Sequence, residues 1–129
     1  SIFTELFGRG DAYELFKSKG MVDFISTSFI RGITLNDCIV LVDESQNLTF
    51  HELDSIVTRI GDNCRIIFSG DFRQSDLERS GDRNGILDFM KVVRSIDGFK
   101  TVSFGEDDIV RSKLVKDYII AKLNEGIYT

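Results

Sequence analysis

Short apolar runs alternate along this chain with amphipathic segments of helical period. The runs CIVLV at Cys38–Val42 and RIIF at Arg65–Phe68 are of the kind expected for buried strands. Between them, the segment Thr49–Ile60 carries apolar residues at every third or fourth position, the period of a helix with one buried face. Strands that alternate with helices of about three turns are typical of βαβ units. The sequence therefore predicts an α/β fold of three layers, in which helices cover both faces of a mostly parallel sheet.

Further segments extend this alternation along the rest of the chain. Thr49 stands three residues before Glu52, the spacing of a capping box, so the central helix has a well-defined start. By the same reasoning, the other expected elements are helices over Asp11–Lys19, Ile86–Ile96 and Asp108–Leu123, and short strands over Met21–Ser26 and Lys100–Phe104.

Composition narrows the class of protein. One domain is expected for 129 residues of which 42% are hydrophobic, because such a chain can bury a core. A formal net charge of −5 argues against binding nucleic acid through overall positive charge. Cys38 and Cys64 lie far apart in apolar runs, which suits buried thiols better than a disulfide framework and favours a reducing, cytoplasmic setting. No apolar stretch of about 18 residues occurs, so no membrane contact is predicted.

Polar residues follow both of the central apolar runs. The first run ends in DESQ at residues 43–46 and the second in SGD at residues 69–71. Ligands of parallel sheets bind at the carboxyl ends of the strands. An apolar strand that ends on two acids is the pattern of a Walker B site, in which Asp43 would hold hydrated Mg²⁺ and Glu44 would polarise the attacking water. The alternative is that both acids simply end the strand and solvate a loop.

These motifs together resemble the PhoH-like family of P-loop ATPases, whose core is similar to that of superfamily 1 helicases. The resemblance rests on the segments FIRGITLNDCIVLVDESQNLTFHELDSIVTRIG, IIFSGDFRQSDL and DDIVRSKLV, and it covers nearly the whole chain. The family usually has Asp-Glu-Ala-Gln at the strand end, whereas residues 43–46 here are Asp-Glu-Ser-Gln. The resemblance implies that residues 1–129 are the C-terminal part of a single PhoH-like P-loop ATPase domain, an incomplete RecA-like core.

The resemblance also implies an ATP-hydrolysing site in which different residues have different roles. Its catalytic residues would be Glu44, Gln46, Gln74 and Arg111, and its nucleotide-binding residues Arg31, Asp43, Gly70 and Asp71, with Asp43 also the ligand of Mg²⁺. The two glutamines would sense the terminal phosphate. The late arginine would offset the charge that develops during phosphoryl transfer.

The arginines and glutamines also have plainer interpretations. Arg31 would pair with a surface carboxylate, and Arg111 with Asp108 one turn earlier on a helix. Gln46 and Gln74 would then be ordinary loop hydrogen-bonding groups. Because both follow strand ends expected to lie side by side, where a converging amide usually has a specific partner, a functional role is favoured for both.

The sequence lacks the motif G-x-x-x-x-G-K-[ST], whose backbone cradles phosphate in P-loop proteins. We expect that loop upstream of Ser1 in a longer protein, and we expect this chain alone to be inactive. The expected function is Mg²⁺-dependent ATP hydrolysis, with coupling to RNA or single-stranded DNA and assembly into a homo-oligomer left open. The alternative is a non-catalytic, truncated module of the same fold that binds a protein partner through its open edge.

Overall fold

The computed structural model describes residues 2–27, 30, 32–71 and 85–127. The chain divides into two compact units, Ser1–Ile33 and Thr34–Thr129. None of the helices in the described residues is long and apolar enough to cross a membrane.

The first unit contains two short helices, α1 (Ile2–Phe7) and α2 (Ala12–Ser18), that contact each other. The predicted helix over 11–19 is confirmed as α2, whereas α1 was not predicted. Asp11 precedes α2 but gives it no side-chain cap, because its carboxylate binds the Arg9 guanidinium at 2.9 Å. That hydrogen bond lowers the pKa of Asp11 below its ordinary value. The predicted strand over 21–26 is wrong, since these residues form no strand.

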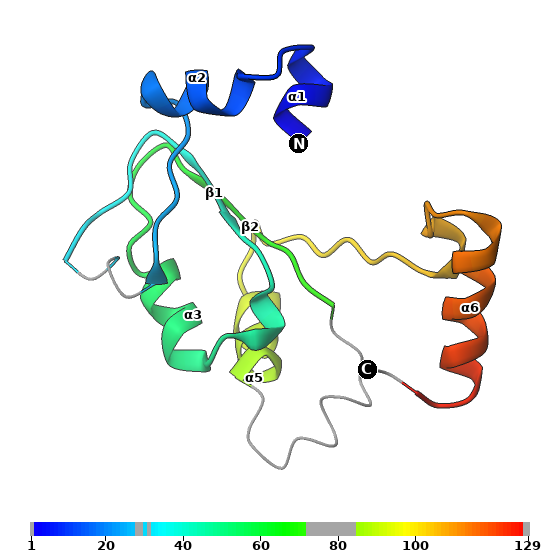
Figure 1. Ribbon diagram of the computed structural model, residues 1–129. Helices are drawn as coiled ribbons and strands as arrows, with labels where there is room; N and C mark the ends of the chain where they lie inside the picture. The colour runs from blue at the N-terminus through cyan, green and yellow to red at the C-terminus, as the bar shows by residue number, and fades with distance from the viewer. Residues whose placement is uncertain (1, 28–29, 31, 72–84, 128–129) are drawn as a thin grey trace. The chain divides into compact units, whose positions relative to one another are not determined.

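The second unit contains the predicted parallel strands. β1 (Ile39–Val42) and β2 (Arg65–Phe68) pair over four residues, with Ile39 opposite Arg65 and Val42 opposite Phe68. The helix α3 (Phe50–Val57) lies between them in sequence, so β1, α3 and β2 form the expected βαβ unit (Figure 1).

The start of α3 is set by the capping box. The hydroxyl of Thr49 accepts the amide of Glu52 at 3.2 Å, and the Glu52 carboxylate accepts the amide of Thr49 at 2.8 Å. Two amide groups that the helix itself leaves unpaired are thereby satisfied. The predicted start is confirmed, and α3 ends at Val57, three residues before the predicted end.

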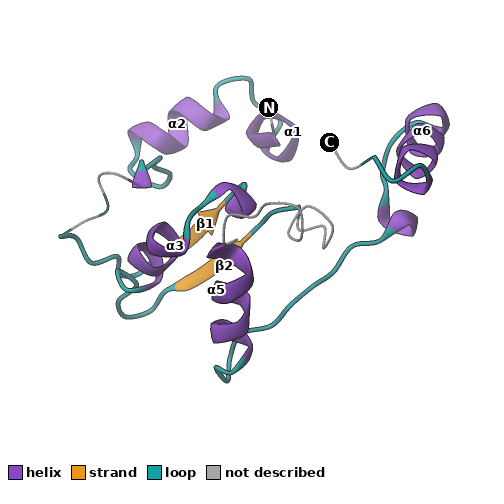
Figure 2. Ribbon diagram, turned by 90° about the horizontal axis from the view of Figure 1, so that it is seen from below, coloured by secondary structure: helices purple, strands orange, loops and turns teal. Residues whose placement is uncertain are grey.

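A small core lies where α3 meets α5 (Gly85–Arg94) and β2. Leu53 of α3 packs with Ile86 and Phe89 of α5, and the Phe89 ring meets the Phe68 ring edge-on with centroids 4.8 Å apart. Figures 1 and 2 show α3 and α5 together beside the two strands. The first residue of α5 must be small, because a Cβ on Gly85 would lie 2.1 Å from the backbone nitrogen of Phe50.

The opposite face of the strands is exposed. Side chains alternate between the faces of a strand. Val42 is buried toward the helices, whereas Ile39 is 71%, Leu41 66% and Ile67 52% exposed on the other side. The expectation that the Cys38–Val42 run is covered on both faces is thus met on the side of α3 and α5 only, as far as the described residues show.

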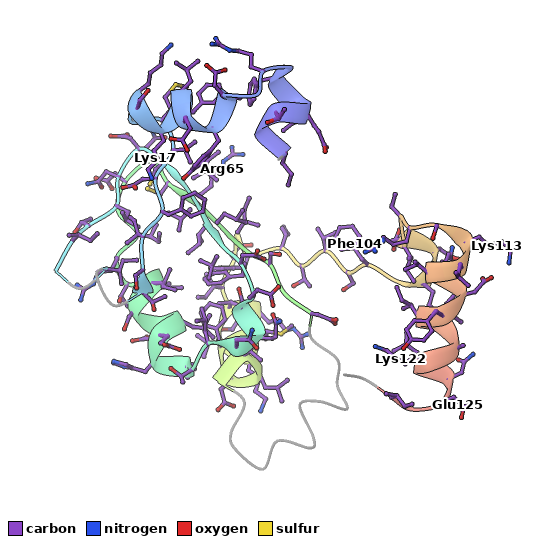
Figure 3. All side chains as sticks on the ribbon, viewed as in Figure 1. Lys17, Arg65, Phe104, Lys113, Lys122 and Glu125 are labelled. Atoms are coloured by element: carbon purple, nitrogen blue, oxygen red, sulfur yellow. The ribbon has the colours of Figure 1, made fainter. Side chains whose placement is uncertain are left out.

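The C-terminal part of the second unit differs from the prediction at two points. The predicted strand over 100–104 is wrong, since no described strand pairs with this exposed segment, on which Phe104 lies (Figure 3). The last helix, α6 (Lys113–Asn124), starts five residues later than expected. Its start is fixed by Ser112, whose hydroxyl accepts the amide of Val115 at 3.4 Å. The acids at 106–108 form a separate turn of 3₁₀ helix, η3 (Glu106–Asp108).

We predict that Leu53→Ala lowers the free energy of unfolding by about 3 kcal/mol, within the range typical of fully buried leucines. Leu53 has no exposed surface, so the substitution leaves a cavity between α3 and α5. Leu114→Ala on α6 is the matched control, because Leu114 is 79% exposed and should change stability by less than about 0.5 kcal/mol. Urea unfolding followed by circular dichroism measures both. Equal midpoints for the two variants would show that this core does not stabilise the chain.

Candidate functional site

The two strands end side by side, and the loops that follow them are hydrogen-bonded together. The amide of Ser69 donates to the Val42 carbonyl at 2.9 Å, and the amide of Ser45 donates to the Ser69 carbonyl at 3.0 Å. The strand pairing thus continues beyond Val42 and Phe68 into the polar residues. The predicted convergence of these strand ends is confirmed. We call Asp43, Glu44, Ser45, Gln46, Ser69 and Asp71 the strand-end cluster.

Asp43 and Glu44 are exposed and lie on a sharp backbone turn. Glu44 has a φ of 52°, in the left-handed region that residues with a side chain rarely adopt. One oxygen of Asp43, Oδ1, accepts the Glu44 amide at 2.9 Å and the Ser69 hydroxyl at 3.2 Å. Strained backbone of this kind is common at functional sites. Here Glu44 stands between the end of β1 at Val42 and a short turn of 3₁₀ helix that begins at Ser45.

Two serines of the strand-end cluster, Ser45 and Ser69, were not among the site residues predicted from the sequence. Ser45 is fully buried, and its hydroxyl donates to the Val42 carbonyl at 2.9 Å. Ser69 binds Asp43 and also carries the backbone link between the loops. Their position could have predicted these contacts, since serine side chains often form hydrogen bonds with nearby backbone groups.

Gln46 joins the two loops through both ends of its amide. Its Nε2 donates to Glu44 Oε2 at 2.6 Å, and its Oε1 accepts the backbone amide of Asp71 at 3.3 Å. This orientation of the amide satisfies both partners, because nitrogen donates and oxygen accepts. These contacts are hydrogen bonds within and between the two loops, so the role of Gln46 as a phosphate sensor and its role as an ordinary loop hydrogen-bonding group both stay predictions. Gln46 thus links the carboxylate of Glu44 to the loop after β2.

The structure leaves several predicted site residues unassigned. Gln74 and Arg31 lie outside the described residues, so their roles stay predictions. Gly70 and Asp71 follow β2 in the loop that Gln46 contacts. Arg111 is exposed, and among the described residues no hydrogen bond or ion pair joins it to the strand-end cluster.

The alternative role of Arg111, as a helical partner of Asp108, is wrong. Arg111 precedes α6 instead of lying one turn after Asp108 on a helix. The Asp108 carboxylate accepts the backbone amide of Gly105 at 2.7 Å. This plainer explanation for Arg111 is thereby removed, and its catalytic role stays a prediction.

The strand-end cluster fits a magnesium ion that also binds phosphate and water. Within residues 2–27, 30, 32–71 and 85–127, no group of three or more His, Cys, Asp or Glu side chains is placed to hold a metal. Mg²⁺ usually needs only one or two carboxylates, with phosphate oxygens and water completing its coordination. Both hydrogen bonds of the Asp43 carboxylate reach Oδ1. Its Oδ2 has none within the described part of the chain, so it can act as a metal ligand.

Comparison with known proteins gives a consistent result. A family model described as "PhoH-like protein" matches residues 3–122. The chain is 32% identical over 111 residues to a "PhoH-like protein" of Bacillus subtilis (strain 168), covering 86% of this chain and 34% of that protein. It is 32% identical over 104 residues to a "PhoH-like protein" of Mycobacterium leprae (strain TN), covering 81% and 30%. To "Protein PhoH" of Escherichia coli (strain K12) it is 35% identical over 95 residues, covering 74% and 27%. The chain thus spans about a third or less of each relative.

Proposed function

Because the chain belongs to the PhoH-like protein family, we propose that it supplies the residues of an ATP-hydrolysing site that bind magnesium and position the attacking water. The phosphate-binding loop of that site would come from sequence outside this chain. In this proposal, residues 1–129 are the C-terminal part of one P-loop domain with three layers, in which further elements cover the exposed face of β1 and β2.

The observation that carries the proposal is the hydrogen-bonded cluster at the ends of β1 and β2. Oδ2 of Asp43, next to Glu44, accepts no hydrogen bond from the part of the chain that the structure describes, and Gln46 Nε2 donates to the Glu44 carboxylate at 2.6 Å. When bound there, Mg²⁺ would neutralise phosphate charge during hydrolysis. Glu44 would accept a hydrogen bond from the attacking water and align it with the terminal phosphate. Gln46 would keep that carboxylate in position and connect it to the loop carrying Gly70 and Asp71.

The remaining roles rest on the family resemblance. Gln74 would sense the terminal phosphate, Arg111 would offset charge in the transition state, and Arg31 would contact the nucleotide. Coupling of hydrolysis to RNA or single-stranded DNA belongs to the same proposal. Steady-state ATP turnover by the full-length protein tests it, with and without Mg²⁺ and with each nucleic acid added. An unchanged rate with both nucleic acids would remove the coupling.

A second candidate function is that of a non-catalytic module that binds a protein. The exposed apolar residues Ile39, Leu41 and Ile67 favour it, because monomers seldom leave such a sheet face uncovered. ATP turnover by the full-length protein separates the two functions. Magnesium-dependent turnover supports the enzyme, whereas absence of turnover together with a stable complex formed through this face supports the module.

We predict that Gln46→Ala lowers the ATP turnover of the full-length protein by about tenfold or more. The substitution removes both amide contacts, so the Glu44 carboxylate loses its fixed position, and small misplacements of catalytic groups are costly. Asn47→Ala is the matched control, because it removes an exposed amide from the same short turn, η2 (Ser45–Asn47). Turnover is measured as phosphate release at saturating Mg²⁺ and ATP. Equal rates for the two variants would show that Gln46 has no positioning role.

A further inference from the structure

The opposite ends of the same strands bring the two cysteines together. Cys38 directly precedes β1 and Cys64 directly precedes β2. Because Ile39 lies opposite Arg65, the register places the two cysteines opposite each other one step earlier. The amide of Arg65 donates to the Cys38 carbonyl at 3.1 Å, which continues the pairing to this position. The thiols thus meet although they lie 26 positions apart in the sequence.

The two sulfur atoms are in contact. Both cysteines are free and partly buried, and their Sγ atoms lie 3.6 Å apart. The Cys64 thiol also donates to the Leu35 carbonyl at 3.1 Å. Strands that neighbour each other are about 4.8 Å apart, which lies within the Cα separation of about 4.4–6.8 Å that a disulfide needs. The strand pairing therefore provides a backbone spacing compatible with a disulfide, and the sulfurs must move from 3.6 Å to a bonding distance of about 2.05 Å.

The backbone around the cysteines is held by matched contacts. Asp37 and Asn63, which directly precede the cysteines, both have left-handed backbone, with φ of 54° and 55°. Asn63 Nδ2 donates to Asp37 Oδ1 at 2.9 Å, and the Asp37 amide donates to the Asp62 carbonyl at 3.0 Å. The Asp62 amide donates in turn to Asn36 Oδ1 at 2.9 Å. The segments that lead into β1 and β2 are thus hydrogen-bonded to each other. This bonding holds the two cysteines next to each other in the folded chain.

We propose that Cys38 and Cys64 are an oxidative modification site, at which a small-molecule disulfide joins them by a bond across the starts of β1 and β2. One thiolate attacks the oxidant and forms a mixed disulfide, releasing one small thiol. The second cysteine then displaces the other small thiol and forms the intramolecular bond. The two cysteines lose two electrons and two protons in total, and the oxidant becomes two thiols. The site is independent of the proposed ATP-hydrolysing function, since it lies at the other ends of the strands.

Two physical properties of the pair shape this reaction. Partial burial, followed by the neighbouring Cys64 thiol, raises the pKa of Cys38 above its ordinary value. Little Cys38 thiolate is therefore present at neutral pH, which slows its direct attack on an oxidant. The bond would close a loop that contains all of α3, and closing a loop of this length stabilises the folded state by roughly several hundredfold in the folding equilibrium constant.

The test is incubation of the full-length protein with oxidised glutathione, followed by thiol titration and peptide mass spectrometry without reduction. We expect a direct Cys38–Cys64 linkage with no glutathione retained, and reversal by dithiothreitol. Cys38→Ser and Cys64→Ser should each retain one glutathione on the remaining cysteine. The proposal is overturned if the wild-type protein keeps both thiols free, or if it carries one glutathione on each cysteine.

A stability measurement provides a second readout. Oxidation of the wild-type protein should raise its thermal unfolding midpoint, and dithiothreitol should return the midpoint to its original value. The two serine variants should show no comparable rise. A midpoint that falls or stays constant on oxidation would show that the pair is not preorganised for this bond, whatever the ATP turnover of the protein.

Discussion

Glu44→Gln is expected to lower ATP turnover by the full-length protein by at least about a hundredfold. Glutamine has nearly the shape of glutamate, and its amide oxygen can still accept the hydrogen bond from Gln46 Nε2. The left-handed turn and its contacts should therefore persist. What is lost is the negative charge that polarises the attacking water. The measurement is steady-state phosphate release at saturating ATP and Mg²⁺.

The control for this variant is Glu125→Gln, which removes the same charge from an exposed residue at the end of α6 (Figure 3). It should leave turnover unchanged. If Glu44→Gln and the wild-type protein hydrolyse ATP at equal rates, Glu44 has no part in activating water. Glu44 would then be only a solvent-exposed residue of the turn after β1.

The second large effect is expected for Asp43→Asn, which should lower turnover about a hundredfold or more at millimolar Mg²⁺. Asparagine still offers Oδ1 to the Glu44 amide and the Ser69 hydroxyl, so the turn can keep its hydrogen bonds. The charged oxygen that would bind the metal is lost, and hard cations such as Mg²⁺ prefer carboxylate ligands. Turnover is measured across a series of Mg²⁺ concentrations. We expect the variant to need more Mg²⁺ than the wild-type protein for half of its maximal rate.

The matched control for Asp43→Asn is Asp54→Asn, an exposed acid on α3 whose side chain lies outside the strand-end cluster. Its Mg²⁺ dependence should match that of the wild-type protein. An Asp43→Asn protein with full activity and an unchanged Mg²⁺ dependence would exclude this residue as the metal ligand.

The βαβ unit could be predicted because its local signals agree with its packing. The runs that became β1 and β2 are short and apolar, and the Thr49–Glu52 capping box marks the start of α3 within the chain itself. Local preference and tertiary burial point to the same structure here, which is the condition under which sequence patterns are most informative.

The sequence could not show which strand-like segments lack a pairing partner. Residues 21–26 and 100–104 have the composition of strands, but neither is one in the structure. A strand is stable only through hydrogen bonds to a neighbour, and that neighbour is not encoded in the segment itself. The start of α6 was misplaced for a different reason. Acids at 106–108 suit a helix start, yet they form η3, and the Ser112 hydroxyl caps α6 five residues after the predicted start.

The site was partly predictable. The adjacency of DESQ and SGD follows from parallel pairing, so the convergence of Gln46 with the loop after β2 could be expected. The contact between Gln46 and Glu44 could not, because it depends on left-handed backbone at Glu44, and a glutamate gives no sequence signal for that conformation. The bonds of Ser45 and Ser69 likewise depend on the register of the two strands.

Nucleotide binding by titration calorimetry, with and without Mg²⁺, tests most directly the claim that the acids after β1 meet a metal-bound triphosphate. The measurement compares the full-length wild-type protein with its Glu44→Gln and Asp43→Asn variants. We predict that Mg²⁺ strengthens ATP binding equally in the wild-type and Glu44→Gln proteins and much less in Asp43→Asn. The same Mg²⁺ effect in all three proteins would contradict the claim.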